Sequence, residues 1–187
     1  MAARDKGWFL EHIYNDEYVK VDPEYVKDRP ERQSKNLIYR YSYARKAIRH
    51  LDYGAGNGEL VRRMAAAGFD STPYDPFSHA SRPEGVFNLI SCFEVFEHVP
   101  DPQALMADLA SLLSPQGVLL FSTLTSDGAI SQGKPLDWWY AAPRNGHISL
   151  FSRESLARLA KQHGLHYQIT QQGTHAFWKE LPPWAAD

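Results

Sequence analysis

Cysteine is nearly absent from this chain of 187 residues, because Cys92 is its single one. No disulfide can form within the chain, and no cysteine cluster can hold zinc. Long apolar runs are also missing: the longest strongly apolar stretch, residues 117–124, is far shorter than the roughly 20 residues that cross a bilayer. The N-terminus lacks the apolar core of a secretory signal. We therefore expect a cytoplasmic protein with no membrane partner.

Neither sign of charge dominates, since 20 basic and 22 acidic residues give a formal net charge of −2. Proteins that bind nucleic acid without sequence preference usually carry a basic surface, so the balance favours a small-molecule partner over nucleic acid. Basic residues do gather between residues 27 and 49. We interpret them as a solvated helix face, with an acidic or phosphate-bearing substrate as the alternative. Nothing in the pattern predicts an oligomeric state.

Apolar residues make up 43% of the chain and charged residues 22%, values typical of a soluble globular protein. A helix is predicted over residues 32–48. From residue 50 onward, short apolar runs alternate with amphipathic stretches, which is typical of βαβ units. Strands are expected at 50–53, 71–74, 86–93 and 118–124, and helices at 59–67, 101–113 and 152–162. The pattern predicts an α/β protein with a Rossmann-like, mostly parallel sheet, helices on both faces, and a closing antiparallel hairpin at 165–170 and 175–179.

A glycine-rich turn follows the first expected strand and opens the first helix: residues 51–58 read LDYGAGNG. Glycines permit a tight turn and let a ligand approach the backbone. Here the chain resembles class I S-adenosylmethionine-dependent methyltransferases of the small-molecule branch, whose first motif has this form. The resemblance implies S-adenosylmethionine as cofactor, bound by Tyr53, Gly54, Ala55 and Gly56. An ordinary strand-to-helix turn is the alternative interpretation.

Asp75 ends the second expected strand, 23 positions after Asp52. A spacing of about 20 residues places such a carboxylate within reach of ribose hydroxyls. We therefore predict that Asp75 and the adjoining Pro76 bind the cofactor. The alternative is a turn or cap aspartate before proline.

A second resemblance to the same family lies in residues 87–102, FNLISCFEVFEHVPDP. In the family, the backbone after this strand borders the methionine part of the cofactor, which implies that Cys92, Phe93 and Glu94 contact it. Asn88 stands where the family usually has aspartate, so an electrostatic role at that position is in doubt.

A third resemblance lies in residues 143–152, PRNGHISLFS, just before the last predicted helix. It implies that His147 borders the acceptor pocket. An imidazole can take a proton from an attacking hydroxyl near neutral pH, so His147 is the first candidate base and His98 the second. Either histidine could instead satisfy backbone groups of its loop.

The connection from Asp75 to Phe87 is short, with only 11 residues between them. The family usually inserts a helix, a third strand and a further helix here. We therefore expect the third strand to be shortened or missing, which leaves recognition of the adenine open. An extended connection of this length can still pass neighbouring strands and re-enter the sheet.

Four side chains also suggest a divalent metal: Glu94, Glu97, His98 and His147 combine carboxylates with imidazoles. Ubiquinone-pathway O-methyltransferases and plant small-RNA 2′-O-methyltransferases look similar at this Glu-x-x-Glu-His pattern with a later histidine. Many metal-free relatives carry Glu-His-Val there as well. We favour a bracing role for the pair and expect no metal.

Two domains of unequal kind are predicted: an N-terminal helical and aromatic extension, residues 1–49, that covers the cofactor site, and a methyltransferase domain, residues 50–187. Trp138, Trp139 and Tyr140 lie in a long aperiodic segment, where they either line an acceptor pocket or pack as core. The function favoured is O- or N-methylation of a small molecule. The alternatives are a protein that binds S-adenosylmethionine or S-adenosylhomocysteine without methyl transfer, and a nicotinamide dehydrogenase of the same topology.

Overall fold

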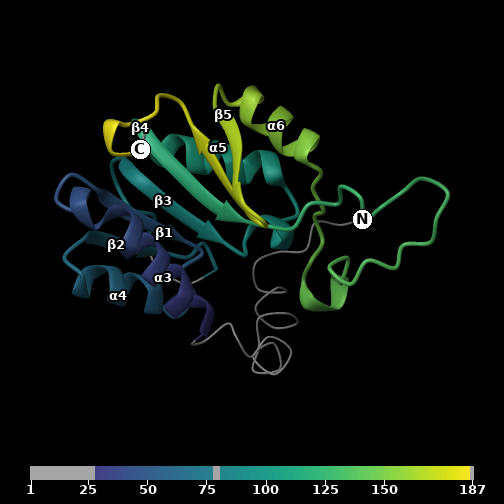
Figure 1. The fold of residues 1–187 in the computed structure, drawn as a ribbon, viewed down its shortest axis with the longest axis horizontal. Coiled ribbons are helices and arrows are strands. Elements are labelled where there is room, and N and C mark those ends of the chain that lie inside the picture. The colour runs from purple at the N-terminus through teal and green to yellow at the C-terminus, as the bar shows by residue number, and fades with distance from the viewer. Residues whose placement is uncertain (1–27, 78–80, 186–187) are drawn as a thin grey trace.

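A mixed six-stranded sheet forms the centre of the computed structural model, which describes residues 28–77 and 81–185 (Figure 1). The strand order is β2-β1-β3-β4-β6-β5. The first four strands run parallel: β1 (Arg49–Tyr53), β2 (Asp70–Tyr74), β3 (Phe87–Phe93) and β4 (Leu113–Ser122). The hairpin β5 (His166–Gln171) and β6 (Thr174–Trp178) completes the sheet, with β6 antiparallel to both β4 and β5. The predicted fold class is confirmed.

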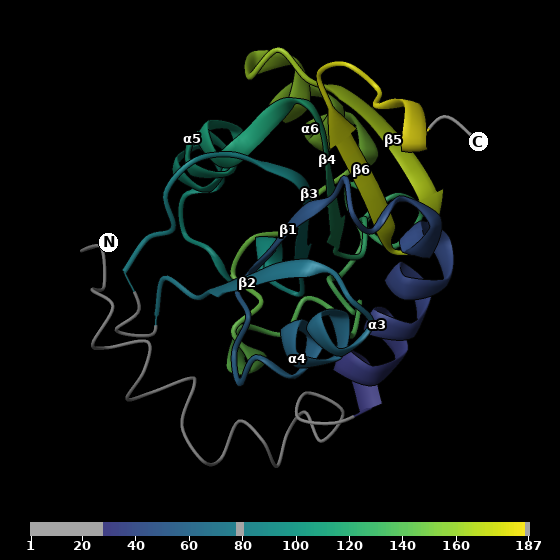
Figure 2. The same cartoon turned by 90° about the vertical axis from the view of Figure 1, so that its left-hand side faces the viewer.

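Helices cover both faces of this sheet (Figures 1 and 2). One face packs against α3 (Asp28–Tyr41) and α4 (Glu59–Ala66), and the other against α5 (Pro102–Leu112) and α6 (Arg153–Gln162). Alternation along β4 serves both layers, because Leu119 joins the apolar cluster under α5 and α6 while Leu120 joins the cluster under α3 and α4. Full burial of such a side chain contributes about 1.5–3 kcal/mol. Four single turns of 3-10 helix complete the described elements: Ser42–Ala44, Phe96–His98, Pro143–Asn145 and Pro183–Ala185.

Two of these helices begin at side-chain caps. The Asp101 carboxylate accepts hydrogen bonds from the backbone N–H groups of Gln103 and Ala104, which starts α5 where the sequence predicted. Ser152 accepts from the N–H of Ser155 at the start of α6, and the Ser155 hydroxyl accepts from the Ser152 N–H. These caps orient the two helices that cover one face of the sheet.

Two elements, α3 and β4, have boundaries that differ from the sequence prediction by four residues or more. The helix expected over 32–48 begins at Asp28 and ends at Tyr41, where a 3-10 turn takes over. Strand β4 begins at Leu113 rather than at residue 118, because Leu113 pairs with Phe87 and an irregularity of register precedes the pairing of Val118 with Leu89. Pro115 and Gly117, residue types typical of turns, therefore lie in a bulged part of the strand.

The connection between β2 and β3 contains no strand in its described residues, 75–77 and 81–86. Strand β2 is therefore the edge of the sheet as described, in line with the expectation of a shortened or missing third strand. Across residues 28–77 and 81–185, no helix has the length and apolar character needed to span a membrane.

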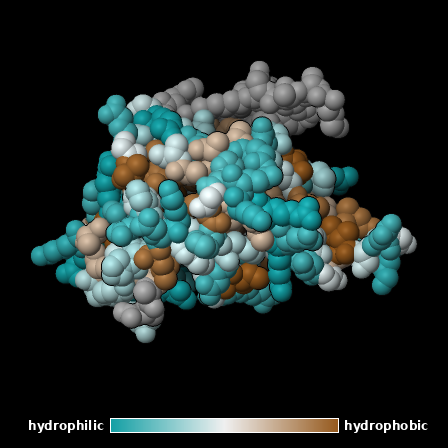
Figure 3. Space-filling view, turned by 90° about the horizontal axis from the view of Figure 1, so that it is seen from above, coloured by the Kyte–Doolittle hydropathy of each residue, from teal (hydrophilic) through white to brown (hydrophobic). Residues whose placement is uncertain are grey.

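The segment between β4 and α6 extends away from the sheet at the right of Figure 1. A single bridge between Thr125 and Phe151 closes its base. On the face seen in Figure 3, brown residues lie in separate groups among teal ones over the part drawn in colour. This mixed surface is ordinary for a globular protein.

Candidate active site

The glycine turn joins β1 to α4 with three residues in the left-handed region, Gly54, Gly56 and Gly58. A Cβ atom at position 54 would lie 2.4 Å from Cγ2 of Val95, so a larger residue there would need both strain and displacement. The backbone N–H groups of Gly54 and Ala55 donate to the carbonyl of Tyr74, at 2.7 and 3.2 Å. The turn is thereby attached to the end of β2.

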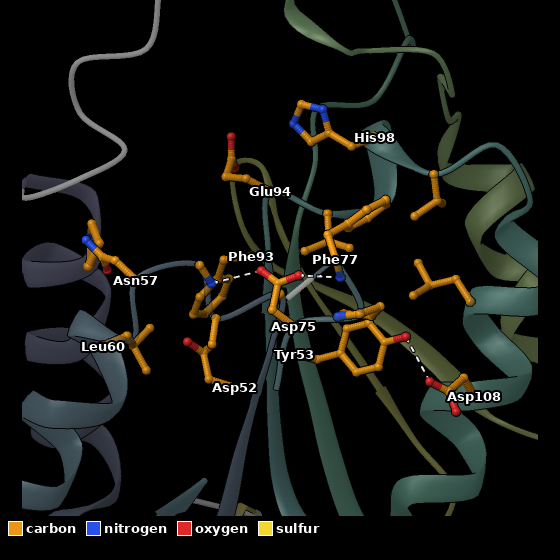
Figure 4. Close-up of a pocket in the computed structure, with 18 of the residues that line it drawn as sticks. Asp52, Tyr53, Asn57, Leu60, Asp75, Phe77, Phe93, Glu94, His98 and Asp108 are labelled. Carbon is orange, nitrogen blue, oxygen red and sulfur yellow. Dashed lines mark hydrogen bonds between the residues drawn. The ribbon is translucent and has the colours of Figure 1, made fainter. Parts of the chain in front are cut away.

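Asp75, the residue after Tyr74, contacts the same turn through its side chain (Figure 4). Its Oδ2 accepts a hydrogen bond from the N–H of Gly56 at 3.0 Å, and its Oδ1 accepts one from the N–H of Phe77 at 2.8 Å. An ionised carboxylate has about four acceptor positions, so these two bonds leave capacity for ligand hydroxyls. The predicted pairing of the glycine turn with Asp75 thus exists as direct contact.

A cavity of about 640 Å³ opens over the carboxyl ends of the parallel strands. Ligands of open α/β sheets bind at this edge, and the volume suits a small-molecule ligand. Most of the predicted cofactor residues line it, namely Tyr53, Gly54, Ala55, Gly56, Asp75, Pro76, Phe93 and Glu94. His98 lines it too, whereas Cys92 and His147 are not among its walls.

Cys92 of β3 does not line this cavity. Its side chain is fully buried in the cluster under α5 and α6, and burial raises the pKa of its thiol. Alternation along the strand explains the placement, because neighbouring residues point to opposite faces. The Cys92 side chain therefore shares an apolar cluster with Tyr53 but does not reach the cavity that the other predicted cofactor residues line.

Glu94 has an unusual backbone where β3 ends: its φ is +56°, a left-handed value that costs a non-glycine residue about 1–3 kcal/mol. Ser122 holds it there, since its Oγ accepts from the Glu94 N–H at 2.8 Å and donates to Glu94 Oε1 at 2.6 Å. Such strain is found often at functional sites. In Figure 4, Glu94 and His98 lie at the same end of the cavity.

Asp52 also lines the cavity, although the sequence analysis did not select it as a site residue. Its side chain is almost fully buried, and burial raises its pKa to about 7, partly offset by a hydrogen bond from Ser91. Its place in the glycine motif was the available signal. Arg29 and Gln33 of α3 line the cavity as well, and only tertiary packing reveals them.

The wall formed by α5 is fastened by Asp108. Its Oδ2 accepts from the hydroxyl of Tyr53 at 2.8 Å, and its Oδ1 accepts from Nε of Arg82 at 2.8 Å. Arg82 belongs to the short connection between β2 and β3. The abbreviated segment is thus tied to the helix that borders the cavity.

Glu97, His98 and His147 come together beside this cavity, with one ligating atom from each within 4.8 Å of the others. Glu97 is fully buried, and burial together with the nearby charge of Glu94 raises its pKa. Its Oε1 accepts from the Tyr140 hydroxyl at 2.7 Å, while its Oε2 has no hydrogen-bond partner among the residues described. A buried oxygen of this kind is costly unless something binds it.

A backbone carbonyl orients the His147 side chain toward the same cluster. Its Nδ1 lies 2.8 Å from the backbone carbonyl of Tyr140, so Nδ1 carries the proton and Nε2 keeps a lone pair. Its ring meets that of His98 edge to face, with centroids 5.0 Å apart. An imidazole fixed by a carbonyl in this way is typical of a metal ligand. The two candidate bases are therefore neighbours, with His98 at the cavity and His147 behind it.

The aromatic group at 138–140 does not line the cavity. Trp139 is 74% exposed, and Tyr140 is buried against Glu97 and His147. The Trp138 ring packs against the Tyr140 ring, with their centroids 5.1 Å apart. Neither earlier interpretation fits the whole group: Tyr140 supports the cluster, and Trp139 faces solvent. The N-terminal tyrosines before residue 28 lie outside the described residues.

Comparison with known families places this architecture in a defined class. The family model described as a methyltransferase domain matches residues 23–168, so the chain belongs to that family. With the motifs of the sequence, this assigns S-adenosylmethionine as the cofactor.

Named relatives are more specific. The chain is 32% identical over 148 residues to a ubiquinone biosynthesis O-methyltransferase of Aromatoleum aromaticum, an alignment that covers 63% of each protein. It is 32% identical over 104 residues to the protein of the same name from Escherichia coli K12, covering 42% of this chain and 43% of that one. The matched part thus spans less than two thirds of these relatives.

Solved structures share the fold at low identity. The plantazolicin methyltransferase BpumL superposes with a TM-score of 0.59 and 13% identity, covering 92% of this chain and 91% of that one. Magnesium protoporphyrin IX methyltransferase from Synechocystis PCC 6803 gives a TM-score of 0.57 and 15% identity, covering 95% and 97%. These likenesses support the architecture alone.

Proposed function

We propose that this chain transfers the methyl group of S-adenosylmethionine to a hydroxyl of a small molecule, with an amine as the second choice of acceptor. One observation carries the proposal: a single cavity holds the glycine turn and Asp75 on one side and adjoins the His98 cluster on another. Similarity to ubiquinone biosynthesis O-methyltransferases supports an oxygen acceptor.

The chemistry asks little of the protein beyond alignment. Methyl transfer from a sulfonium is an in-line displacement with an excellent leaving group, so positioning and exclusion of water supply much of the acceleration. A hydroxyl acceptor also has to lose a proton. His98 reaches the cavity and is the nearer base when no cation is bound. In the metal-bound form proposed below, His98 and His147 are ligands, and the cation assists loss of the proton instead.

The test is product formation. The purified protein is incubated with labelled S-adenosylmethionine and a series of phenols, catechols and amines, and both S-adenosylhomocysteine and the methylated product are measured. The proposal predicts stoichiometric formation of the two products with a hydroxyl acceptor. Tight binding of S-adenosylhomocysteine without turnover on any acceptor would instead support the alternative of a binding protein that does not transfer methyl groups.

We further propose that Glu97, His98 and His147 hold a divalent cation, against the bracing role that the sequence favoured. The fully buried, unpartnered Oε2 of Glu97 and the fixed tautomer of His147 are the supporting observations. One carboxylate and two imidazoles suit Zn²⁺, Mn²⁺ or Fe²⁺. When bound, such a cation would act as a Lewis acid that lowers the pKa of the acceptor hydroxyl.

Removing the metal tests this assignment. After EDTA treatment and desalting, we expect turnover to fall at least tenfold and to return on addition of Mn²⁺ or Zn²⁺. Glu97→Gln should abolish calorimetric binding of Mn²⁺, and the exposed Glu154→Gln should leave it intact. Unchanged turnover after EDTA, with no Mn²⁺ heat in the wild type, would restore the bracing role.

We also propose that residues 1–49 cover the donor side of the cavity, because Arg29, Pro30 and Gln33 near the start of α3 already line it. The part before residue 28 lies outside the described residues. A cytoplasmic location is proposed from the single, buried free cysteine.

A further inference from the structure

A line of polar side chains crosses strands β2, β1 and β3 on the face covered by α3 and α4. The Ser71 hydroxyl lies 2.7 Å from Nδ1 of His50, and Nε2 of His50 lies 2.9 Å from the Ser91 hydroxyl. Ser91 in turn donates to Asp52 Oδ1 at 2.6 Å. His50 and Ser91 are fully buried, beside apolar neighbours such as Leu89.

When Asp52 is ionised, these hydrogen bonds can run in only one direction. Burial lowers the pKa of His50 to about 3, so its imidazole is neutral and has one donor and one acceptor nitrogen. Ser91 has a single proton and gives it to Asp52, so it must accept a proton from Nε2 of His50. Nδ1 is then the acceptor for Ser71. Every donor in the line points toward the Asp52 carboxylate.

Asp52 is where this line meets the cavity. It ends the line on β1, next to Tyr53 and the glycine turn, and lines the proposed donor site. A nearly buried carboxylate tends to take up a proton unless hydrogen bonds or a cation stabilise its charge. Polarised hydrogen bonds in series strengthen one another in a low-dielectric interior.

We propose that His50 is a positioning residue: the line Ser71, His50 and Ser91 orients Asp52 and favours its carboxylate form, which faces the ammonium group in the amino-acid part of the donor. The inference rests on the proposed function, since it takes the cavity to be the donor site. No residue of the line other than Asp52 touches the cavity.

Two ligands separate this role from a structural one. S-adenosylhomocysteine carries the charged amino-acid part, and 5′-deoxy-5′-methylthioadenosine lacks it. We expect Ser91→Ala to weaken binding of S-adenosylhomocysteine about tenfold or more, because a hydrogen bond to a charged group is lost. His50→Leu should weaken it less and Ser71→Ala least, and the affinity for methylthioadenosine should stay within about twofold.

His175 provides the matched control. It is another buried histidine of the sheet, bonded to the Thr123 carbonyl and the Tyr167 hydroxyl, and it does not line the cavity. His175→Leu should cost stability without changing the ratio of the two affinities. If His50→Leu and Ser91→Ala also leave that ratio unchanged, the positioning role is overturned while the proposed function stands.

A measurement on the wild-type protein does not depend on variants that fold. Nitrogen-15 NMR of the histidine rings should show His50 as the neutral Nε2–H tautomer at pH 8, above the pKa of Asp52. An Nδ1–H tautomer or an imidazolium would overturn the inference. Failure of the wild type to bind either ligand would contradict the proposed function instead, and the tautomer would still report on the line itself.

Discussion

Single side chains at this site serve the fold and the ligand together. Asp75 accepts hydrogen bonds from two backbone N–H groups, one in the glycine turn and one in its own turn, and it faces the cavity as well. Ser122, a residue of strand β4, likewise makes two hydrogen bonds to Glu94, one to its backbone and one to its side chain. Substitution at such residues should therefore change binding more than it changes unfolding.

Asp75→Asn tests this at the turn. The amide offers one acceptor oxygen where two N–H groups now donate, so one of them faces an NH₂ group. We expect the affinity for S-adenosylhomocysteine to fall about tenfold or more. Asp70→Asn, at the exposed other end of β2, is the control and should leave the affinity unchanged. Equal affinities in all three proteins would exclude Asp75 from the donor site.

Asp52 makes donor binding depend on pH. Its pKa is raised to about 7 by burial and by the charge of Asp75, so the carboxyl is protonated in the free protein below that value. The ammonium group of the ligand favours the ionised form of Asp52, and binding then requires loss of the proton. The affinity for S-adenosylhomocysteine should weaken by about fivefold as the pH falls from 7 to 6. In Asp52→Asn this slope should vanish, and a slope that persists would assign it to another group.

At the scale of elements, the glycine turn depends on the end of β3. Gly54 and Gly128 both have a φ near +80°, but a Cβ at 54 would strike Val95, whereas nothing lies within 4 Å of a Cβ at 128. We expect Gly54→Ala to lower the free energy of unfolding by about 1–3 kcal/mol more than Gly128→Ala does, because overpacking adds to backbone strain. Urea unfolding of both variants measures the difference, and similar values would place the Val95 contact in doubt.

How far the elements could be predicted depended on how local their signals are. Asp101, Ser152 and the glycine turn are local signals, and they located α5, α6 and the start of α4. The start of β4 was missed because a Pro-Gln-Gly sequence is typical of a turn, and only pairing with β3 makes it part of a strand. The end of α3 was missed because a 3-10 turn at Ser42–Ala44 continues the chain in a helical form past Tyr41.

The same distinction holds within the site. Residues of the glycine turn and Asp75 could be predicted because their spacing along the chain determines their approach in a parallel sheet. The contact of Glu97 and His98 with His147 joins segments about 50 residues apart, and their burial beside Tyr140 could not be predicted from spacing. Burial of Glu97 is the fact that turned a weak pattern into a proposed metal site.

In the whole molecule, the polar line, the apolar layer and the cavity occupy different parts of the sheet: its two faces and the edge at the strand ends. One face carries the line from Ser71 to Asp52 under α3 and α4, and the other is an apolar layer under α5 and α6. The cavity opens at the carboxyl ends of the strands, where both layers contribute walls. A bound donor therefore contacts elements from both halves of the fold and should stabilise them jointly.

Calorimetric titration of the folded wild-type protein with S-adenosylhomocysteine tests the central claim most directly, with NAD as the comparison ligand. We predict saturable binding of one molecule per chain, and a thermal unfolding midpoint that rises with ligand concentration as linkage requires. Absence of binding by a protein whose cooperative unfolding shows it to be folded, or saturable binding of NAD in its place, would contradict the account.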